Sequence, residues 1–283
     1  IYNPAYEEGY KILDLKALNI QKLTAGIIVS IDGKQYKVGD PRHEPTWAVD
    51  SLLAPVGSIA AKLKFAKYAV ANAIRKQKND SFDQRTDQFL SRKFGKDLTQ
   101  KALRPFLAGV FLEDELATSK RFFDIVLKTF VTGQPGVPEN GMFEIPRQLA
   151  AQLPAEAIFL NTTVTKVLPG KVETSSGEVN CRAIILAANA KSAAALLPKL
   201  QIPTSNSVTT WYHLADCSAE ELTEGHGTLI VDGKRYQVNS VDPNRPVVNT
   251  VAISNAAPSY STEGRVLVSS SAIGVHHSTA AES

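Results

Sequence analysis

The N-terminal part of the chain alternates apolar and polar positions on both sides of a turn. Apolar residues over 27–31 lead into Asp32-Gly33, and Tyr36 and Val38 then alternate with Gln35 and Lys37. An Asp-Gly pair between two such runs is typical of a type I′ turn, so the pattern predicts a β-hairpin. The segment 231–238 has nearly the same pattern and predicts a second hairpin. Eight matching residues are too few to indicate a repeat architecture.

From residue 57 to residue 153 the apolar positions follow helical spacing. Ser58 can cap a helix, whose apolar residues form one stripe that consists of Ile59, Leu63, Ala66, Val70, Ala73 and Ile74. The basic residues Lys64, Lys67, Arg75 and Lys78 lie away from this stripe. We expect the stripe to face the core; a basic amphipathic helix on an anionic membrane is the alternative. Further helices are predicted over 83–93, 97–106, 119–130 and 145–153, with Thr118 or Ser119 capping the third of these.

After residue 157 the pattern changes to short strands, over 158–160, 164–168, 171–174 and 178–180. The continuous apolar run 183–187 is typical of a strand that is buried on both faces of a parallel sheet. Asn189 is a suitable cap for a helix that ends before Pro198. Four further strands, predicted as antiparallel, cover 208–214, 228–231, 247–253 and 266–273. This order predicts a mixed α/β (α+β) fold in which the first and last parts share one sheet.

Composition narrows the classes of protein only a little. The 283 residues are 43% hydrophobic and 21% charged with a net charge of +3, which is ordinary for a globular protein and argues against a nucleic-acid partner. Cys181 and Cys217 lie far apart, and no apolar run reaches about 18 residues. We therefore expect a cytoplasmic protein, with peripheral attachment to a membrane as the alternative. Both ends of the chain favour a fragment of a longer protein, and the sequence specifies no oligomeric state.

Motifs that carry chemistry are not found. Gly225-His226-Gly227 lacks the third glycine of a dinucleotide-binding loop, and 136–141 is followed by Met142-Phe143 instead of the Lys and Ser/Thr of a phosphate loop. The acidic trio 113–115 and the pair His276-His277 could hold a metal, but a structural role is the simpler interpretation. The sequence thus predicts no catalytic residue and no metal ligand.

Three stretches in this order resemble the middle of the flavin-containing amine oxidoreductase family. They are 104–111 (RPFLAGVF) continuing into 116–119 (LATS), 141–150 (GMFEIPRQLA), and 161–167 (NTTVTKV) followed by 183–188 (AIILAA). Within the family, the protoporphyrinogen oxidase and carotenoid desaturase-like members are the most similar. The resemblance covers most of residues 1–200 and fades beyond them.

The resemblance implies FAD as the cofactor and a division into two domains. Residues 1–155 and 199–283 would form a substrate domain of antiparallel sheet and helices, and 156–198 would be an incomplete α/β part of the FAD-binding domain. The glycine loop and the C-terminal glycine segment with which the family holds FAD are not found here. Val164, Ala187 and Ala188 match positions beside the nucleotide, so they are the expected cofactor wall.

The resemblance also implies a cavity for a small amine or a conjugated apolar substrate, which is oxidised by hydride transfer to flavin. The expected lining consists of Phe106, Val110, Phe111, Phe122, Phe123, Gly141 and Met142. We expect the parent protein to be an enzyme, whereas this chain is expected to be inactive and to bind no FAD. A non-catalytic binding or assembly module and a membrane-docking domain are the alternatives.

Overall fold

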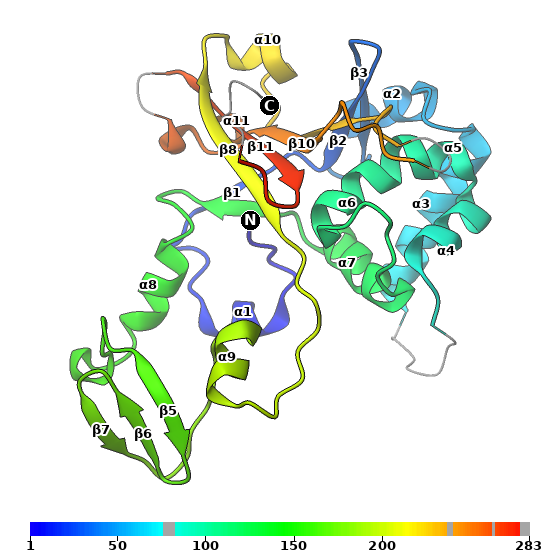
Figure 1. The fold of residues 1–283 in the computed structure, drawn as a ribbon. Coiled ribbons are helices and arrows are strands. Elements are labelled where there is room, and N and C mark those ends of the chain that lie inside the picture. Colours follow the sequence, from blue (N-terminus) through cyan, green and yellow to red (C-terminus); the bar gives the residue numbers. More distant parts are fainter. Residues whose placement is uncertain (76–82, 237–239, 262–263, 278–283) are drawn as a thin grey trace. The chain divides into compact units, whose positions relative to one another are not determined.

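The computed structural model describes residues 1–75, 83–236, 240–261 and 264–277. The chain forms two compact units, one of residues 1–148 with 206–283 and one of residues 149–205 (Figure 1).

The larger unit is built on a six-stranded sheet in the order β3-β2-β9-β10-β11-β8. Its strands are β2 (Gly26–Ile31), β3 (Lys34–Gly39), β8 (Val208–Ala215), β9 (Leu229–Asp232), β10 (Val247–Ala252) and β11 (Val266–Ile273). The strands of the last part pair antiparallel, as expected. One pair differs from the expected antiparallel sheet, because β2 and β9 run parallel. A parallel pair needs a long connection, which the chain between these two strands supplies.

The first predicted hairpin is confirmed and the second is not. β2 and β3 pair from Gly26↔Gly39 to Ile31↔Lys34, and the turn residues Asp32 (φ 52°) and Gly33 (φ 76°) both have the positive φ of a type I′ turn. The segment of the second predicted hairpin begins in β9, whose two edges are already paired with β2 and β10. The following residues therefore cannot return beside β9, and residues 237–239 lie outside the described part of the chain.

Helices fill the connection between β3 and β4 (Gly136–Pro138). They are α2 (Ala48–Leu53), α3 (Ile59–Ile74), α4 (Thr86–Phe94), α5 (Lys96–Leu98), a π-helical turn (Thr99–Leu103), α6 (Arg104–Phe111) and α7 (Lys120–Thr132). The cap Ser58 is confirmed, because its Oγ accepts a hydrogen bond from the Ala61 amide (3.2 Å). Of the two candidates for α7, Thr118 and Ser119, the structure uses Ser119, whose Oγ accepts a hydrogen bond from the Arg121 amide (3.1 Å). The helix expected over 97–106 is longer, because α5, the π-turn and α6 follow one another without a break.

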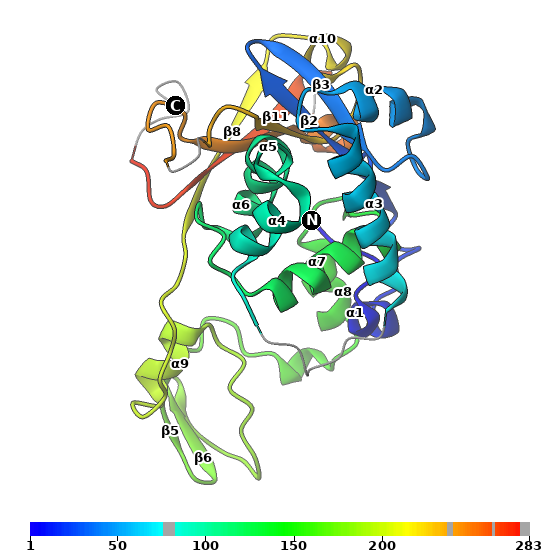
Figure 2. The same cartoon turned by 90° about the vertical axis from the view of Figure 1, so that its right-hand side faces the viewer.

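Shorter elements complete this unit. They are α1 (Glu7–Ile12), β1 (Ile20–Lys22) paired with β4 (Gly136–Pro138), the start of α8 (Glu144–Ala150), α10 (Ala219–Thr223) and α11 (Ile253–Ala256). Figure 2 shows α4, α6 and α7 gathered on one side of the sheet. The core lies between this side and the helices, where Val29 and Val231 pack with residues such as Leu90, Leu107 and Phe123.

The orientation of α3 contradicts the prediction. The apolar stripe expected in the core is exposed: the side chains of Leu63 and Ile74 are 57% and 80% accessible, and Ile59 and Val70 are exposed as well. The opposite face is turned inward, where Phe65 and Tyr68 pack on Phe94 at ring-centroid distances of 5.2 and 5.5 Å. Aromatic side chains bury more area than aliphatic ones, so they decide which face of the helix meets the core.

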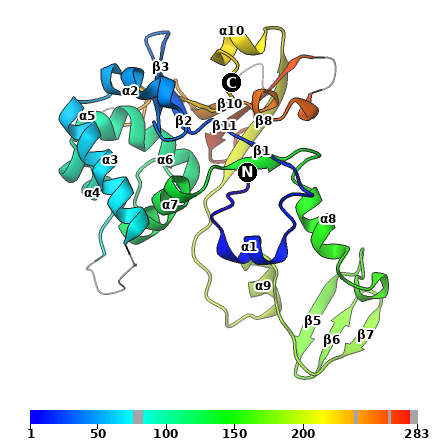
Figure 3. The same ribbon diagram turned by 180° about the vertical axis from the view of Figure 1, so that it is seen from behind.

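The smaller unit contains a three-stranded antiparallel sheet of β5 (Val164–Leu168), β6 (Lys171–Thr174) and β7 (Gly177–Asn180), drawn in green in Figure 3. Asn189 caps α9 (Ala190–Leu196) through a 3.0 Å hydrogen bond from the Ser192 amide, as predicted. The strands predicted over 158–160 and 183–187 are wrong, because neither segment pairs with another strand. A buried parallel strand needs a neighbour on each side, and no described segment takes that place; Ile185 is 92% exposed.

Candidate functional site

Helix α6 carries the first group of predicted cavity residues, and it lies directly against the sheet. Gly109 faces β10, where a Cβ atom at this position would come within 2.2 Å of the Asn249 Nδ2 atom. Glycine therefore allows the helix to approach the strand closely. The end of α6 is fixed by the Phe111 carbonyl, which accepts a 3.2 Å hydrogen bond from the Asn206 side chain.

The aromatic residues of α6 and α7 form two ring pairs between the helices. Phe106 lies 5.3 Å from Phe130 and Phe111 lies 5.6 Å from Phe122, measured between ring centroids. Phe111 (7% accessible) and Phe123 (1%) belong to the core, whereas Phe122 keeps 47% of its surface exposed. Phe106 and Val110 are half-buried. The structure thus brings five predicted cavity residues together, three of which retain accessible apolar surface.

Gly141 and Met142 do not join this group. They form the turn between β4 and α8, in which Gly141 has φ 100° and its amide donates to the Pro138 carbonyl at 3.1 Å. Met142 is 40% exposed, and Phe143 beside it is 74% exposed. The prediction did not include Phe143, although its place in the same motif was a usable signal. An exposed apolar pair on a tight turn is a contact surface without a described partner.

A buried polar cluster joins the end of α6 to the segment after β9. Asp114 Oδ1 lies 2.9 Å from Arg235 Nη2 and accepts a 2.6 Å hydrogen bond from the Tyr236 hydroxyl. Burial, followed by the hydrogen bond to Asp114, raises the pKa of the Tyr236 hydroxyl far above its usual range. Arg104 stacks on the Tyr236 ring at 4.8 Å. All the charged groups are engaged with one another, so the cluster stabilises the fold rather than offering a free acid or base.

The other two acidic residues of the 113–115 trio also have structural partners. Glu113 Oε1 accepts a 2.6 Å hydrogen bond from the Thr118 amide, and Glu115 lies 3.8 Å from Arg85. Within the described ranges, no three His, Cys, Asp or Glu side chains gather as metal ligands would. The structure therefore agrees with the structural interpretation of the trio.

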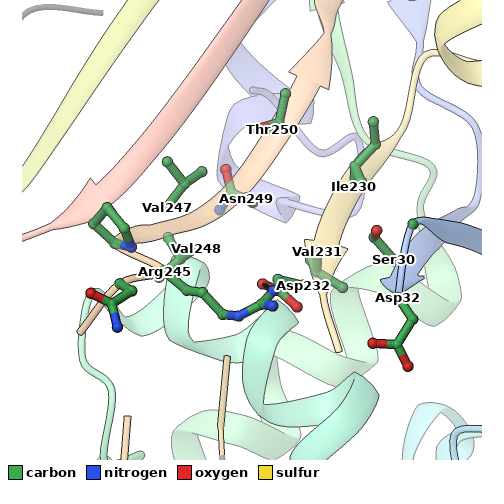
Figure 4. Close-up of a pocket in the computed structure, with 13 residues that line it drawn as sticks. Ser30, Asp32, Ile230, Val231, Asp232, Arg245, Val247, Val248, Asn249 and Thr250 are labelled. Carbon is green, nitrogen blue, oxygen red and sulfur yellow. Dashed lines mark hydrogen bonds and ion pairs between the residues drawn. The ribbon is translucent and has the colours of Figure 1, made fainter. Parts of the chain in front are cut away.

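A cavity of about 300 Å³ opens where β2, β9 and β10 end, and Figure 4 shows its lining. Ser30, Asp32, Asp232, Arg245 and Thr250 are among the lining residues. Its charges are already compensated, because Arg245 pairs with Asp232 (2.5 Å), and Asp32 pairs with Lys234 (2.5 Å). None of the predicted site residues lines it. A polar cavity with paired charges does not suit an apolar substrate.

The predicted cofactor wall lies in the smaller unit and is open to solvent. Val164 is 38% exposed at the start of β5, and Ala187 and Ala188 are exposed in the irregular segment before α9. These side chains can pack against a nucleotide but cannot bind phosphates. The side chain of Asn189, the cap of α9, already accepts a hydrogen bond from the Ser192 amide of that helix. The residues present therefore do not fit FAD by themselves, since a pyrophosphate needs a glycine-rich loop at a helix N-terminus.

Three comparisons place the chain among known proteins. The model of the family described as flavin containing amine oxidoreductase matches residues 15–282. No curated protein matches the sequence. Among solved structures, an oxidoreductase from Methanosarcina mazei is similar with a TM-score of 0.69 and 13% identity, over 96% of this chain and 65% of that one.

Two further structures share the fold. A protein called "Putative protoporphyrinogen oxidase" from Exiguobacterium matches with a TM-score of 0.57 and 15% identity, over 92% of this chain and 62% of its own length. The RAB GDI of Plasmodium falciparum matches with a TM-score of 0.53 and 14% identity, over 96% of this chain and 66% of that one. The chain thus spans slightly less than two thirds of the length of these structures.

No helix in the described ranges combines the length and the apolar character that a membrane-crossing segment needs.

Proposed function

Since the chain belongs to the flavin-containing amine oxidoreductase family, we propose that it forms the substrate side of a flavin-dependent oxidoreductase. The substrate would be a small amine or a conjugated apolar molecule, oxidised by hydride transfer to FAD. In such reactions the flavin supplies the redox chemistry, and the protein supplies orientation and a dry cavity. We place the protein in the cytoplasm and expect no nucleic-acid partner.

The observation that carries this proposal is the apolar surface of α6 and α7. Phe106, Val110 and Phe122 retain accessible surface beside a well-packed core. Such a surface can bind an apolar or aromatic portion of a substrate and exclude water. The charged groups nearest to it in the sequence, at 113–115, are engaged in structural contacts.

The cofactor would be held mainly by residues outside this chain. Val164, Ala187 and Ala188 would contribute only a wall, because no phosphate-binding loop accompanies them. We therefore propose that the 283-residue chain alone neither binds FAD nor turns over substrate. Residues 156–198 would belong to the FAD-binding domain, and 1–155 with 199–283 would form the substrate domain.

The test is the visible absorption spectrum of the purified full-length parent protein. Bound flavin, bleached under anaerobic conditions by an amine or by a conjugated apolar compound, would support the proposal and identify the substrate class. A colourless protein that takes up no added FAD would refute it. The 283-residue chain is titrated with FAD in parallel, and we expect no change in flavin fluorescence.

The role of the aromatic surface is tested separately in the flavin-containing protein. Replacing Phe122 by Ala should slow flavin reduction by about tenfold, the equivalent of about 1.4 kcal/mol of lost contact. Tyr10→Ala is the matched control, since Tyr10 is also an exposed aromatic residue (68%) of the substrate domain but lies outside the aromatic group. Equal reduction rates in the two variants would remove Phe122 from the substrate cavity.

A non-catalytic binding module is the second candidate. It is favoured by the match to RAB GDI, a protein whose name does not describe an oxidoreductase, over 96% of this chain. The same fold supports unrelated functions. A full-length protein that binds no flavin would favour this candidate.

A further inference from the structure

Helices α2 and α3 carry a group of exposed apolar side chains that the proposed redox function does not use. We call this group the α2–α3 surface; it consists of Val49, Leu52, Leu53, Ile59, Leu63, Val70 and Ile74. Leu53 is 72% accessible and Ile74 is 80% accessible. Single exposed apolar residues are ordinary, but seven of them on two helices that contact each other are more than a folded core requires at its surface.

Contacts of α3 with α7 and with α2 fix the position of this surface. At about 100° a residue, the four members on α3 fall within about 60° of the helix circumference. The opposite side of α3 is anchored to α7, where the Tyr68 hydroxyl donates to Asp124 Oδ1 at 2.6 Å. Lys62 Nζ donates to the Leu52 carbonyl at 2.8 Å and to the Ala54 carbonyl, so α2 is fixed beside α3 (Figure 2).

The exposed charge along α3 has one sign, whereas α2 carries one exposed carboxylate, Asp50. Residues 51–75 contain no Asp or Glu, and they include four basic residues, Lys62, Lys64, Lys67 and Arg75. The prediction that Lys67 lies away from the stripe is wrong, because on the helical wheel this residue lies next to Ile74; Lys64 and Arg75 follow farther round on the same side. Because Lys64, Lys67 and Arg75 are exposed, one edge of the stripe is basic and suits an anionic partner.

We propose that the α2–α3 surface docks on an anionic lipid bilayer. The apolar side chains enter the boundary between headgroups and acyl chains, while the lysines contact the lipid phosphates and carboxylates. A second copy of the chain is the poorer occupant, because pairing this surface with itself would bring two basic edges together. The attachment is peripheral.

The test measures sedimentation of the 283-residue chain with phosphatidylcholine vesicles, with and without phosphatidylserine. We expect binding only to the anionic vesicles, and weaker binding when NaCl rises from about 0.1 to about 0.5 M, where screening is stronger. Leu63→Gln combined with Ile74→Gln should weaken binding by at least about tenfold. Lys64→Gln combined with Lys67→Gln should weaken it by a similar factor and reduce its dependence on salt.

Matched controls carry the same changes on other exposed positions. Ile158→Gln with Leu160→Gln removes two exposed apolar side chains, and Lys34→Gln with Lys96→Gln removes two exposed charges. Both control variants should bind as the unchanged chain does. Circular dichroism checks that every variant is folded.

Several outcomes would overturn the proposal. They are equal binding to neutral vesicles, equal effects of the control and surface variants, and binding by this chain that the full-length protein does not show. The last outcome would mean that the rest of the protein covers the surface. If Leu63→Gln with Ile74→Gln changes the mass in light scattering but not the vesicle binding, the occupant is a second copy.

Discussion

At the scale of single residues, the most consequential contact is the ion pair between Asp114 and Arg235. Arg235 is 4% accessible, and its charge is compensated by Asp114 with a Tyr236 hydrogen bond to the same oxygen. Removing one partner leaves a buried charge uncompensated. The resulting loss of folding free energy is far larger than the free energy that the intact pair contributes. This contact connects positions 121 residues apart, so it also ties the segment after β9 to the end of α6.

Replacing Asp114 by Asn should therefore lower the free energy of unfolding by about 3 kcal/mol. Urea denaturation followed by tryptophan fluorescence measures the change. The control is Asp216→Asn, which breaks the pair with Arg265 at a 91% exposed carboxylate and should cost under about 1 kcal/mol. Similar losses in the two variants would show that the Asp114 cluster is not effectively buried.

At the scale of elements, two apolar runs of similar composition differ in structure, since one forms a strand and the other does not. Residues 26–31 become β2, which is paired with β3 and β9. Residues 184–188 form no strand, and Ile185 is almost fully exposed. The difference is the presence of neighbouring strands, because a strand obtains its backbone hydrogen bonds from other segments.

The two runs should differ strongly in amide hydrogen exchange. In the 283-residue chain we expect the amides of 184–188 to exchange at least about 100-fold faster than those of β2, since only β2 must open paired strands to exchange. Mass spectrometry of peptides that cover each run measures the difference. Comparable protection in both peptides would mean that 184–188 is paired in solution.

Helix α3 shows that distant segments also decide which face of a helix is buried. Periodicity located the helix, and Ser58 marked its start, but the apolar stripe and the aromatic side chains lie on different faces. Both faces could have met the core, and the available partners Phe89 and Phe94 selected the aromatic one. The stripe that periodicity assigned to the interior is thereby exposed and becomes the α2–α3 surface.

At the scale of the whole molecule, the parallel pair of β2 and β9 unites the first and last parts of the larger unit. Val29 and Val231 lie opposite each other in this pair and are 0% and 1% accessible. Their contact forms only after the long intervening segment has closed, which makes the sheet a non-local and slowly formed structure.

Replacing either valine by Ala should cost about 2 kcal/mol of unfolding free energy, from lost apolar burial and the remaining void. The double variant should depart from additivity by at least about 0.5 kcal/mol, because the two side chains are neighbours. Chemical denaturation of the single and double variants tests this. Val208→Ala in β8, at a 41% exposed position, should cost under about 1 kcal/mol; strict additivity of the core variants would contradict direct packing.

For the candidate site, the sequence could name residue types but not their neighbours. The aromatic residues of α6 and α7 were found from a short motif and helical spacing, and they lie together in the structure. Their roles in a substrate cavity stay a prediction, as do those of Val164, Ala187 and Ala188. Phe143 and the partners of Asp114 were missed, because exposure and contacts across more than a hundred residues leave no local pattern.

The sequence by itself determined what depends on near neighbours: the type I′ turn at Asp32-Gly33, the caps Ser58 and Asn189, the choice between Thr118 and Ser119 for a third cap, and the positions of most strands and helices. These features arise from backbone conformation and hydrogen bonds within a few residues. Only the tertiary structure decided which face of α3 is buried, that β2 and β9 run parallel, and that 184–188 stays unpaired. Each of these depends on competition between distant segments for the same space. The spacing of apolar residues within one segment does not predict which segment wins.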